Sequence, residues 1–267
     1  MVTQTTAARR SESSAGSLRD NVLVGEGLTK VFGGFAAVKD VHLAVRRGSI
    51  HALIGPNGAG KTTCFNLLTK TLPPTEGRII FDGVDISALR TAEVARRGLV
   101  RSFQISATFP HLTALENVRV ALQSKYGKAF HFWRSLNAVK PLNARAEELL
   151  EQVGLGSNRD VLAAELSYGK KRALEIATTL ALEPIVMLLD EPTAGMGHED
   201  IEPITKLIKQ AAEGRTILLV EHNLSVVSTL CDRITVLQHG EVLTEGTYEE
   251  VSNNPDVISA YMGGVDE

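Results

Sequence analysis

The sequence of 267 residues lacks any apolar run long enough to cross a bilayer. Its longest runs, residues 185–189 and 216–220, have the length of strands, whereas a membrane helix needs roughly 20 apolar residues. Residues 1–20 are rich in Ser, Thr and Ala and lack the apolar stretch of a signal peptide, so we expect a disordered tail outside the fold. If the protein works at a membrane, the sequence predicts that it does so from outside the lipid.

The sequence also lacks a large excess of charge of either sign and has only two cysteines, and both features exclude classes of function. The 28 basic and 31 acidic residues give a net charge of -3 and are spread along the chain, so no nucleic-acid partner is expected. The two cysteines, Cys64 and Cys231, lack the spacing of metal ligands. We expect both to be packing residues in helical segments of a protein from a reducing compartment.

The first part of the folded region has the pattern of β-structure. Runs of β-forming residues at 22–29 and 37–45 precede residues 49–54, an apolar strand that ends directly in a glycine-rich turn. An antiparallel patch followed by an α/β core is therefore expected.

Helices dominate the middle of the chain. Between residues 91 and 182 the pattern is amphipathic, with Leu115, Val118 and Leu122 on one predicted face. Beyond this region, short strands alternate with helical stretches, as in the βαβ units of a parallel sheet. These strands are predicted at residues 185–189, 216–220 and 234–237.

A segment after the first apolar strand carries a phosphate-binding motif. It fits G-x-x-x-x-G-K-[ST] between a strand and a helix, where that motif must lie. Its residues are Gly55, Pro56, Asn57, Gly58, Ala59, Gly60, Lys61, Thr62 and Thr63. Glycines let backbone N–H groups curl around phosphates, and the helix N-terminus adds a favourable dipole. We expect Lys61 to reach the β- and γ-phosphates of ATP and Thr62 to ligate Mg²⁺; the alternative is an ordinary glycine-rich turn.

This motif completes the predicted fold class. We expect an α/β protein with a P-loop NTPase core and a mostly parallel sheet, an N-terminal antiparallel β patch and an inserted α-helical subdomain. The domain should span residues 21–263, with the helical subdomain at about 91–182 and a short tail at 264–267.

Two carboxylates follow the apolar strand at residues 185–189. Asp190 and Glu191 should lie at the carboxyl edge of the sheet, where open α/β sheets bind ligands. We expect Asp190 to hold Mg²⁺, directly or through water, and Glu191 to act as general base toward an attacking water. The plainer alternative is a carboxylate pair that caps the following turn.

The segment Leu166-Ser-Tyr-Gly-Lys170 resembles the signature of ABC-transporter ATPases, whose usual form is Leu-Ser-Gly-Gly-Gln. Tyr168 replaces the first glycine and Lys170 the glutamine, while Ser167 and Gly169 are kept. The resemblance implies that Ser167 and Gly169 act on ATP held by a partner subunit. From the residues alone, Ser167 is equally well interpreted as a helix N-cap.

Other positions match the same family. The resemblance implies that Gln104 senses Mg²⁺ and links the site to the helical subdomain, that His222 contacts the γ-phosphate region, and that Phe32 stacks on adenine. A solvent-facing histidine and a core phenylalanine are the alternatives. One departure stands out, because the loop after Thr193 ends at Gly197 where the family usually has aspartate.

The resemblance extends from residue 22 to residue 263. Within the ABC-transporter family, the sequence looks most like the ATPases of branched-chain amino-acid uptake systems. This closer resemblance is carried by residues 32–38, 100–104, 166–169 and 254–263. ATPases of urea and short-amide importers share this pattern. An ATPase of a lipopolysaccharide-type exporter and a non-transport ABC ATPase remain alternatives.

The resemblance also implies partners. Two such ATPase subunits, identical or paralogous, would enclose two ATP molecules and drive integral-membrane permease subunits that receive substrate from a periplasmic or extracellular binding protein. The chain would then be cytoplasmic and peripheral on the inner face of the cell membrane, with ATP and Mg²⁺ as its ligands. Residues 125–134 interleave aromatic and basic side chains, which fits packing within the subdomain, contact with the permease or nucleic-acid binding.

Overall fold

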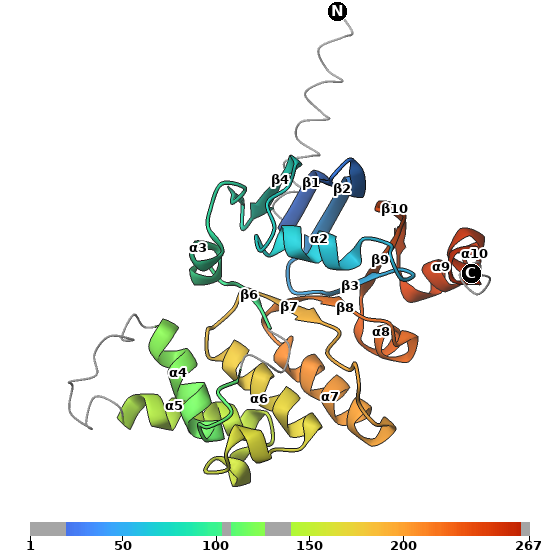
Figure 1. Ribbon diagram of the computed structural model, residues 1–267. Helices are drawn as coiled ribbons and strands as arrows, with labels where there is room; N and C mark the ends of the chain where they lie inside the picture. Colours follow the sequence, from blue (N-terminus) through green and yellow to red (C-terminus); the bar gives the residue numbers. More distant parts are fainter. Residues whose placement is uncertain (1–19, 103–107, 126–139, 263–267) are drawn as a thin grey trace, which may run out of the picture. The chain divides into compact units, whose positions relative to one another are not determined.

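The computed structural model describes residues 20–102, 108–125 and 140–262. The chain divides into two compact units. Of the described residues, 20–91 and 231–262 belong to the first unit, and those between 92 and 230 belong to the second (Figure 1).

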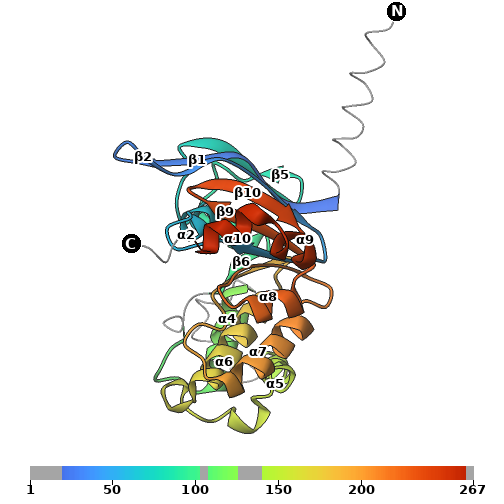
Figure 2. The ribbon, with the colours of Figure 1, turned by 90° about the vertical axis from the view of Figure 1, so that its right-hand side faces the viewer.

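An antiparallel sheet forms one part of the first unit, with the strand order β2-β1-β4-β5. Its strands are β1 (Asn21–Phe32), β2 (Phe35–Arg46), β4 (Glu76–Phe81) and β5 (Val84–Asp85). β1 and β2 form a long hairpin (Figure 2). Gly33 and Gly34 make its two-residue turn with φ values of 53° and 93°, and such a turn needs positive φ at both positions. The predicted antiparallel patch is confirmed and is larger than expected, because β4 and β5 join it.

A second set of strands in the first unit carries the phosphate-binding motif. Strand β3 (Ile50–Ile54) is buried at every position and pairs in parallel with β9 (Arg233–Gln238). β10 (Glu241–Gly246) pairs with β9 in the antiparallel sense. Helix α2 (Lys61–Leu68) follows β3, and the short helices α9 (Tyr248–Ser252) and α10 (Pro255–Met262) lie beside β9 and β10 (Figure 2).

The second unit holds three parallel strands. They are β6 (Leu99–Arg101), β7 (Val186–Asp190) and β8 (Thr216–Val220), with β7 in the centre. Every residue of β7 and β8 is buried, which is typical of parallel strands covered on both faces. The predicted strand at residues 185–189 starts one residue later and includes Asp190.

Helices form the rest of the second unit. They are α3 (Thr91–Arg96), α4 (Ala114–Lys125), α5 (Lys140–Gln152), η3 (Gly156–Asn158), η4 (Ala163–Glu165), α6 (Tyr168–Leu180), α7 (His198–Ala211) and α8 (Leu224–Leu230). α4 and α5 pack against each other and against α6, and α7 lies along α6 (Figure 1). The buried face of α4 centres on Ala114, Val118 and Leu122, so Leu115, expected on that face, lies at its half-buried edge.

Two further expectations can be compared with the structure. Cys64 is buried in α2 as expected, whereas Cys231 lies just beyond the end of α8 rather than within a helix. Among the helices that the structure describes, none has both the length and the apolar character needed to span a membrane.

Candidate functional site

The phosphate-binding loop joins β3 to α2 in the first unit. Gly55, Gly58 and Gly60 have φ values of 150°, 77° and 94°, in the region that glycine adopts without strain. A Cβ on Gly55 would lie 2.2 Å from the carbonyl oxygen of Leu237, and one on Gly60 would lie 2.5 Å from that of Ala37. These two glycines therefore allow the loop to pack against β9 and β2, whereas Gly58 faces open space.

Lys61 is buried at the start of α2, with its ammonium turned into the loop. Its Nζ donates to the carbonyl oxygens of Gly55, at 2.7 Å, and Pro56, at 2.9 Å. Thr62 and Gly58 are exposed. The loop therefore combines a held positive charge, a helix N-terminus and an open glycine, which is the chemistry of a phosphate cradle.

The C-terminal elements also support this loop. Burial raises the pKa of Tyr261 on α10, and a hydrogen bond with the Gly55 backbone partly offsets that rise. The backbone N–H of Gly240, in the β9–β10 turn, donates to the Ala59 carbonyl oxygen at 3.0 Å. Sequence reasoning missed Tyr261, because no motif connects it to a loop some two hundred residues earlier.

Phe32 lies at the tip of the β1–β2 hairpin, and 48% of its surface is exposed. The Nζ atom of Lys30 is 5.3 Å from the centre of its ring. The alternative of a core phenylalanine is therefore wrong. An exposed ring next to a cation can stack on a planar ligand.

The two predicted carboxylates lie at the end of β7 in the second unit. Asp190 is only 9% exposed, and its Oδ2 accepts a hydrogen bond from Nη2 of Arg101 at 2.5 Å. Glu191 follows the strand with a positive φ of 46°. Its Oε1 lies 2.7 Å from Nε2 of His222, so the structure brings together two residues that the sequence places 31 positions apart.

A buried carboxylate that sequence reasoning missed organises these two loops. Glu221 is 3% exposed. Its Oε1 accepts from the backbone N–H and the hydroxyl of Thr193, at 3.0 and 2.6 Å, and its Oε2 accepts from the backbone N–H groups of His222 and Asn223, at 3.0 and 3.2 Å. The loops after β7 and β8 are therefore tied to one side chain. Its position between an apolar strand and His222 was the available signal.

Ser167 takes the N-cap position of α6, although its side chain makes no capping hydrogen bond. Gly169 is buried against α7, where a Cβ would lie 2.8 Å from Oδ1 of Asp200. Ser167, Gly169 and Lys170 border an open groove of about 490 Å³ between α5, α6 and α7. The kept residues of the Leu166–Lys170 segment thus lie at an accessible helix N-terminus. Gln104 lies outside the described residues, as do residues 126–134 of the aromatic and basic stretch.

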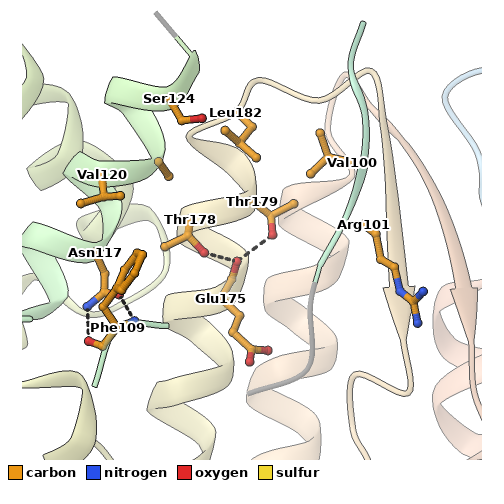
Figure 3. A pocket seen from close by; sticks show the side chains of 11 residues that line it. Val100, Arg101, Phe109, Asn117, Val120, Ser124, Glu175, Thr178, Thr179 and Leu182 are labelled. Carbon is orange, nitrogen blue, oxygen red and sulfur yellow. Dashed lines mark hydrogen bonds between the residues drawn. The ribbon is translucent and has the colours of Figure 1, made fainter. Parts of the chain in front are cut away.

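A second cavity, of about 200 Å³, lies between α4, α6 and the end of β6 (Figure 3). Glu175 on α6 lines it, and the hydroxyls of Thr178 and Thr179 donate to the Glu175 backbone oxygen at 2.9 and 2.8 Å. Burial raises the pKa of the Glu175 carboxyl, and the charge of Arg172 partly offsets this effect. No sequence motif pointed to this cavity.

Comparison with known proteins decides the family. The family model described as ABC transporter matches residues 38–194, more than half of the chain. The chain belongs to the ABC-transporter ATP-binding family. Its C-terminal residues 241–267 also match the model described as branched-chain amino acid ATP-binding cassette transporter, and this segment includes Tyr261, which contacts the phosphate-binding loop of this ABC ATPase.

Curated relatives cover nearly the whole of this ABC ATPase. The high-affinity branched-chain amino acid transport ATP-binding protein LivG of Salmonella typhimurium is 40% identical over 250 residues, which cover 91% of this chain and 98% of LivG. BraF of Pseudomonas aeruginosa, with the same description, is 38% identical over 252 residues, with the same coverage. These findings confirm the family resemblance and favour amino-acid relatives over the exporter and non-transport alternatives.

Solved structures confirm the predicted fold class. A nucleotide-free ATP-binding cassette from an ABC transporter superposes with a TM-score of 0.78 and 30% identity, over 90% of this chain and 98% of that one. The ADP conformation of MJ1267, another ATP-binding cassette, gives 0.77 and 29%, over 91% and 99%.

Proposed function

We propose that this ABC ATPase hydrolyses ATP to energise an importer of branched-chain amino acids. The observation that carries the proposal is the pair formed by Glu191 and His222 directly after Asp190, at the end of a buried parallel strand. A carboxylate whose orientation is fixed by a histidine is suited to activate water, because proton transfer depends on geometry before pKa. The amino-acid substrate follows from the relatives and from the match of the C-terminal segment.

The phosphate-binding loop is the proposed nucleotide cradle. Backbone N–H groups of the loop and the α2 N-terminus would surround the phosphates, and Phe32 would stack on the adenine ring. Lys61 would exchange the carbonyl oxygens of Gly55 and Pro56 for phosphate oxygens. Phosphoryl transfer is mainly a matter of positioning and electrostatics, so these contacts supply much of the catalysis.

Mg²⁺ fits the residues present. The ion commonly uses one or two carboxylates and completes its shell with phosphates, water and other oxygens, and Asp190, Thr62 and Gln104 are our proposed contributors. Asp190 already holds a cation, the guanidinium of Arg101, which must release the carboxylate when a metal ion takes this place. When bound, the ion neutralises charge that develops on the phosphate oxygens.

Glu191 is the proposed general base. Its carboxylate would accept a proton from the water that attacks the γ-phosphorus, while the bond to the leaving ADP oxygen breaks. His222 would hold Oε1 of this carboxylate and contact the γ-phosphate region. The Glu221 hydrogen bonds described above keep both loops in place for this task.

The complete site is proposed to need a second ATPase subunit, either another copy or a paralogue. Ser167 is exposed at the start of α6, and Ser167 and Gly169 both border the open groove there, where they would meet the nucleotide of that partner. The dimeric structure of a relative, the bacterial ABC transporter cassette MJ0796, supports this arrangement. Another, cbiO1, is described as part of an ABC transporter complex, which supports permease subunits as partners. Through them the ATPase is proposed to work on the inner face of the cell membrane.

Uptake in the source organism tests the proposal. Deleting the gene should abolish uptake of radiolabelled leucine and leave urea uptake unchanged. The wild-type gene should restore uptake, whereas Lys61→Ala should not. Loss of urea uptake alone would support the amide-importer alternative, and unchanged uptake of both would reject an import function.

A further inference from the structure

Two side chains of α6 reach the same short loop after β7. The Tyr168 hydroxyl donates to the carbonyl oxygen of Ala194 at 2.7 Å. One turn further along the helix, Nη2 of Arg172 donates to the carbonyl oxygen of Glu191 at 3.2 Å. Residues four positions apart lie on the same helix face, so α6 holds the Glu191–Ala194 turn at both of its ends.

Arg172 is itself fixed by a buried ion pair. Its Nη1 donates to Oε2 of Glu175 at 2.6 Å, and the two side chains are only 7% and 2% exposed. Within the part of the chain that the structure describes, Nε of Arg172 and Oε1 of Glu175 have no hydrogen-bond partner. Burying two charges with incomplete hydrogen bonding is a poor way to gain stability. The pair is better explained by geometry, because Glu175 holds the Arg172 guanidinium in the orientation that reaches the Glu191 carbonyl oxygen.

The loop that the guanidinium holds is strained at the residue proposed to act as base. Glu191 has a φ of 46°, a conformation that costs a non-glycine residue free energy and persists only when its surroundings enforce it. The Glu191 carbonyl oxygen accepts from the Ala194 N–H at 3.1 Å as well as from Arg172. Fixing this peptide fixes the direction in which the Glu191 side chain leaves the backbone.

The Tyr168 contact joins two departures from the usual family pattern. Tyr168 stands where the family has glycine, and the loop that it bonds, residues 194–197, lacks the usual aspartate. A Cβ on Gly195, whose φ is 74°, would lie 3.3 Å from the Tyr168 hydroxyl oxygen, so a small residue there allows the close approach. Glycine at position 168 would offer no hydroxyl for this bond.

We propose that Tyr168 and Arg172 are positioning residues that couple the start of α6 to Glu191 of the same chain. The inference rests on the proposed function. Ser167 and Gly169, at the start of α6, meet the nucleotide that the partner holds, so that nucleotide influences where α6 lies. The hydrogen bonds of Tyr168 and Arg172 then transmit the position of α6 to Glu191, the base for this chain's own nucleotide. Hydrolysis at one site of the dimer thus responds to occupancy of the other.

Tyr168→Phe removes one hydroxyl and keeps the ring. Loss of one hydrogen bond should lower kcat about fivefold to tenfold, with the KM for Mg²⁺-ATP, ATP-driven association and Tm unchanged, and it should lower the cooperativity in ATP. Tyr248→Phe, on α9 in the first unit, is the matched control and should behave as wild type. Wild-type kcat and cooperativity in Tyr168→Phe would overturn the inference.

Arg172→Lys keeps the charge but cannot donate to Glu175 and Glu191 in the same planar geometry. We expect a larger loss of kcat than in Tyr168→Phe, with ATP-driven association retained. A variant that keeps both its Tm and its kcat would contradict the proposed role of the guanidinium.

Mixed dimers separate positioning from direct contact with nucleotide. In the first, a Tyr168→Phe chain is paired with a Glu191→Gln chain, so the remaining base and the substitution share one chain. In the second, a wild-type chain is paired with a Glu191→Gln/Tyr168→Phe chain, so the substituted α6 faces the active nucleotide. Each rate is compared with that of the dimer of wild-type and Glu191→Gln chains.

If Tyr168 positions Glu191 of its own chain, only the first mixed dimer should hydrolyse ATP more slowly, by about fivefold to tenfold. Slowing of the second, of both or of neither would overturn the inference. A wild-type chain without ATPase activity would instead reject the proposed function, so the two failures are distinguishable.

Discussion

Nε2 of His222 lies 2.7 Å from Oε1 of Glu191. The two residues follow neighbouring parallel strands, β7 and β8, whose carboxyl ends meet at the same edge of the sheet. Both side chains remain partly exposed, so a ligand can reach them. The pair is therefore fixed in orientation and still accessible.

His222→Ala should remove the contact that orients the Glu191 carboxylate. We expect kcat to fall by about 10² or more, the scale of one misplaced acid–base group, while nucleotide binding measured with a fluorescent ATP analogue stays within about twofold. His42→Ala, on the exposed surface of β2, is the control. A His222→Ala chain with wild-type kcat would remove His222 from the site.

Glu221→Gln should destabilise the second unit. The wild-type carboxylate accepts four hydrogen bonds, two at each oxygen. In glutamine one of these oxygens becomes an amide nitrogen, which donates and cannot accept. The unfolding free energy should fall by about 1–3 kcal/mol and kcat should fall with it. Chemical denaturation and phosphate release measure the two effects, with exposed Glu213→Gln as the control; unchanged values in Glu221→Gln would show that the carboxylate does not tie the loops.

Gly60→Ala should be more damaging to the apo protein than Gly58→Ala. Both residues have positive φ, so each substitution introduces backbone strain of about 1–2 kcal/mol. Only the methyl group at residue 60 also meets backbone, the carbonyl oxygen of Ala37 at 2.5 Å. Without nucleotide, thermal unfolding should show a larger decrease in Tm for Gly60→Ala, and equal decreases would contradict the packing of the loop against β2.

His51 gives the fold a specific dependence on pH. Its ring is fully buried on β3 and accepts or donates one hydrogen bond with the Thr235 hydroxyl at 2.8 Å, and burial lowers its pKa to about 4. Between pH 6.5 and 4 the His51 ring binds a proton in the unfolded chain but stays neutral in the folded chain. Stability is therefore lost as the pH falls through this range, by about 3 kcal/mol for a shift of this size.

His51→Asn removes this titration and keeps a side chain able to bond Thr235. The unfolding free energy of the variant should depend less steeply on pH between 6.5 and 4 than that of the wild type, by up to one proton. Equal slopes in denaturant titrations at several pH values would show that folding does not shift the pKa of His51.

Local sequence patterns were enough to propose Lys61, Thr62, Asp190 and Glu191 as site residues, because each lies in a contiguous motif at the end of an apolar strand. Pairing of β4 with β1 was not foreseen, since the first half of β4 is exposed and its sequence lacks the alternation of a half-buried strand. The contact of Arg172 with Glu191 and that of Glu221 with Thr193 span 19 and 28 residues. No periodicity encodes such contacts, because the tertiary packing of α6 and of the two loops creates them.

The most direct test of the account uses Glu191→Gln with Mg²⁺ and ATP. The substitution keeps the size of the side chain and removes the base, so nucleotide should bind and drive stable association while phosphate release falls by 10² or more. Size measurement by light scattering and a phosphate assay on the same sample give both readings. Association without turnover is the predicted result, and turnover at the wild-type rate would contradict the assignment of Glu191 and with it the proposed mechanism.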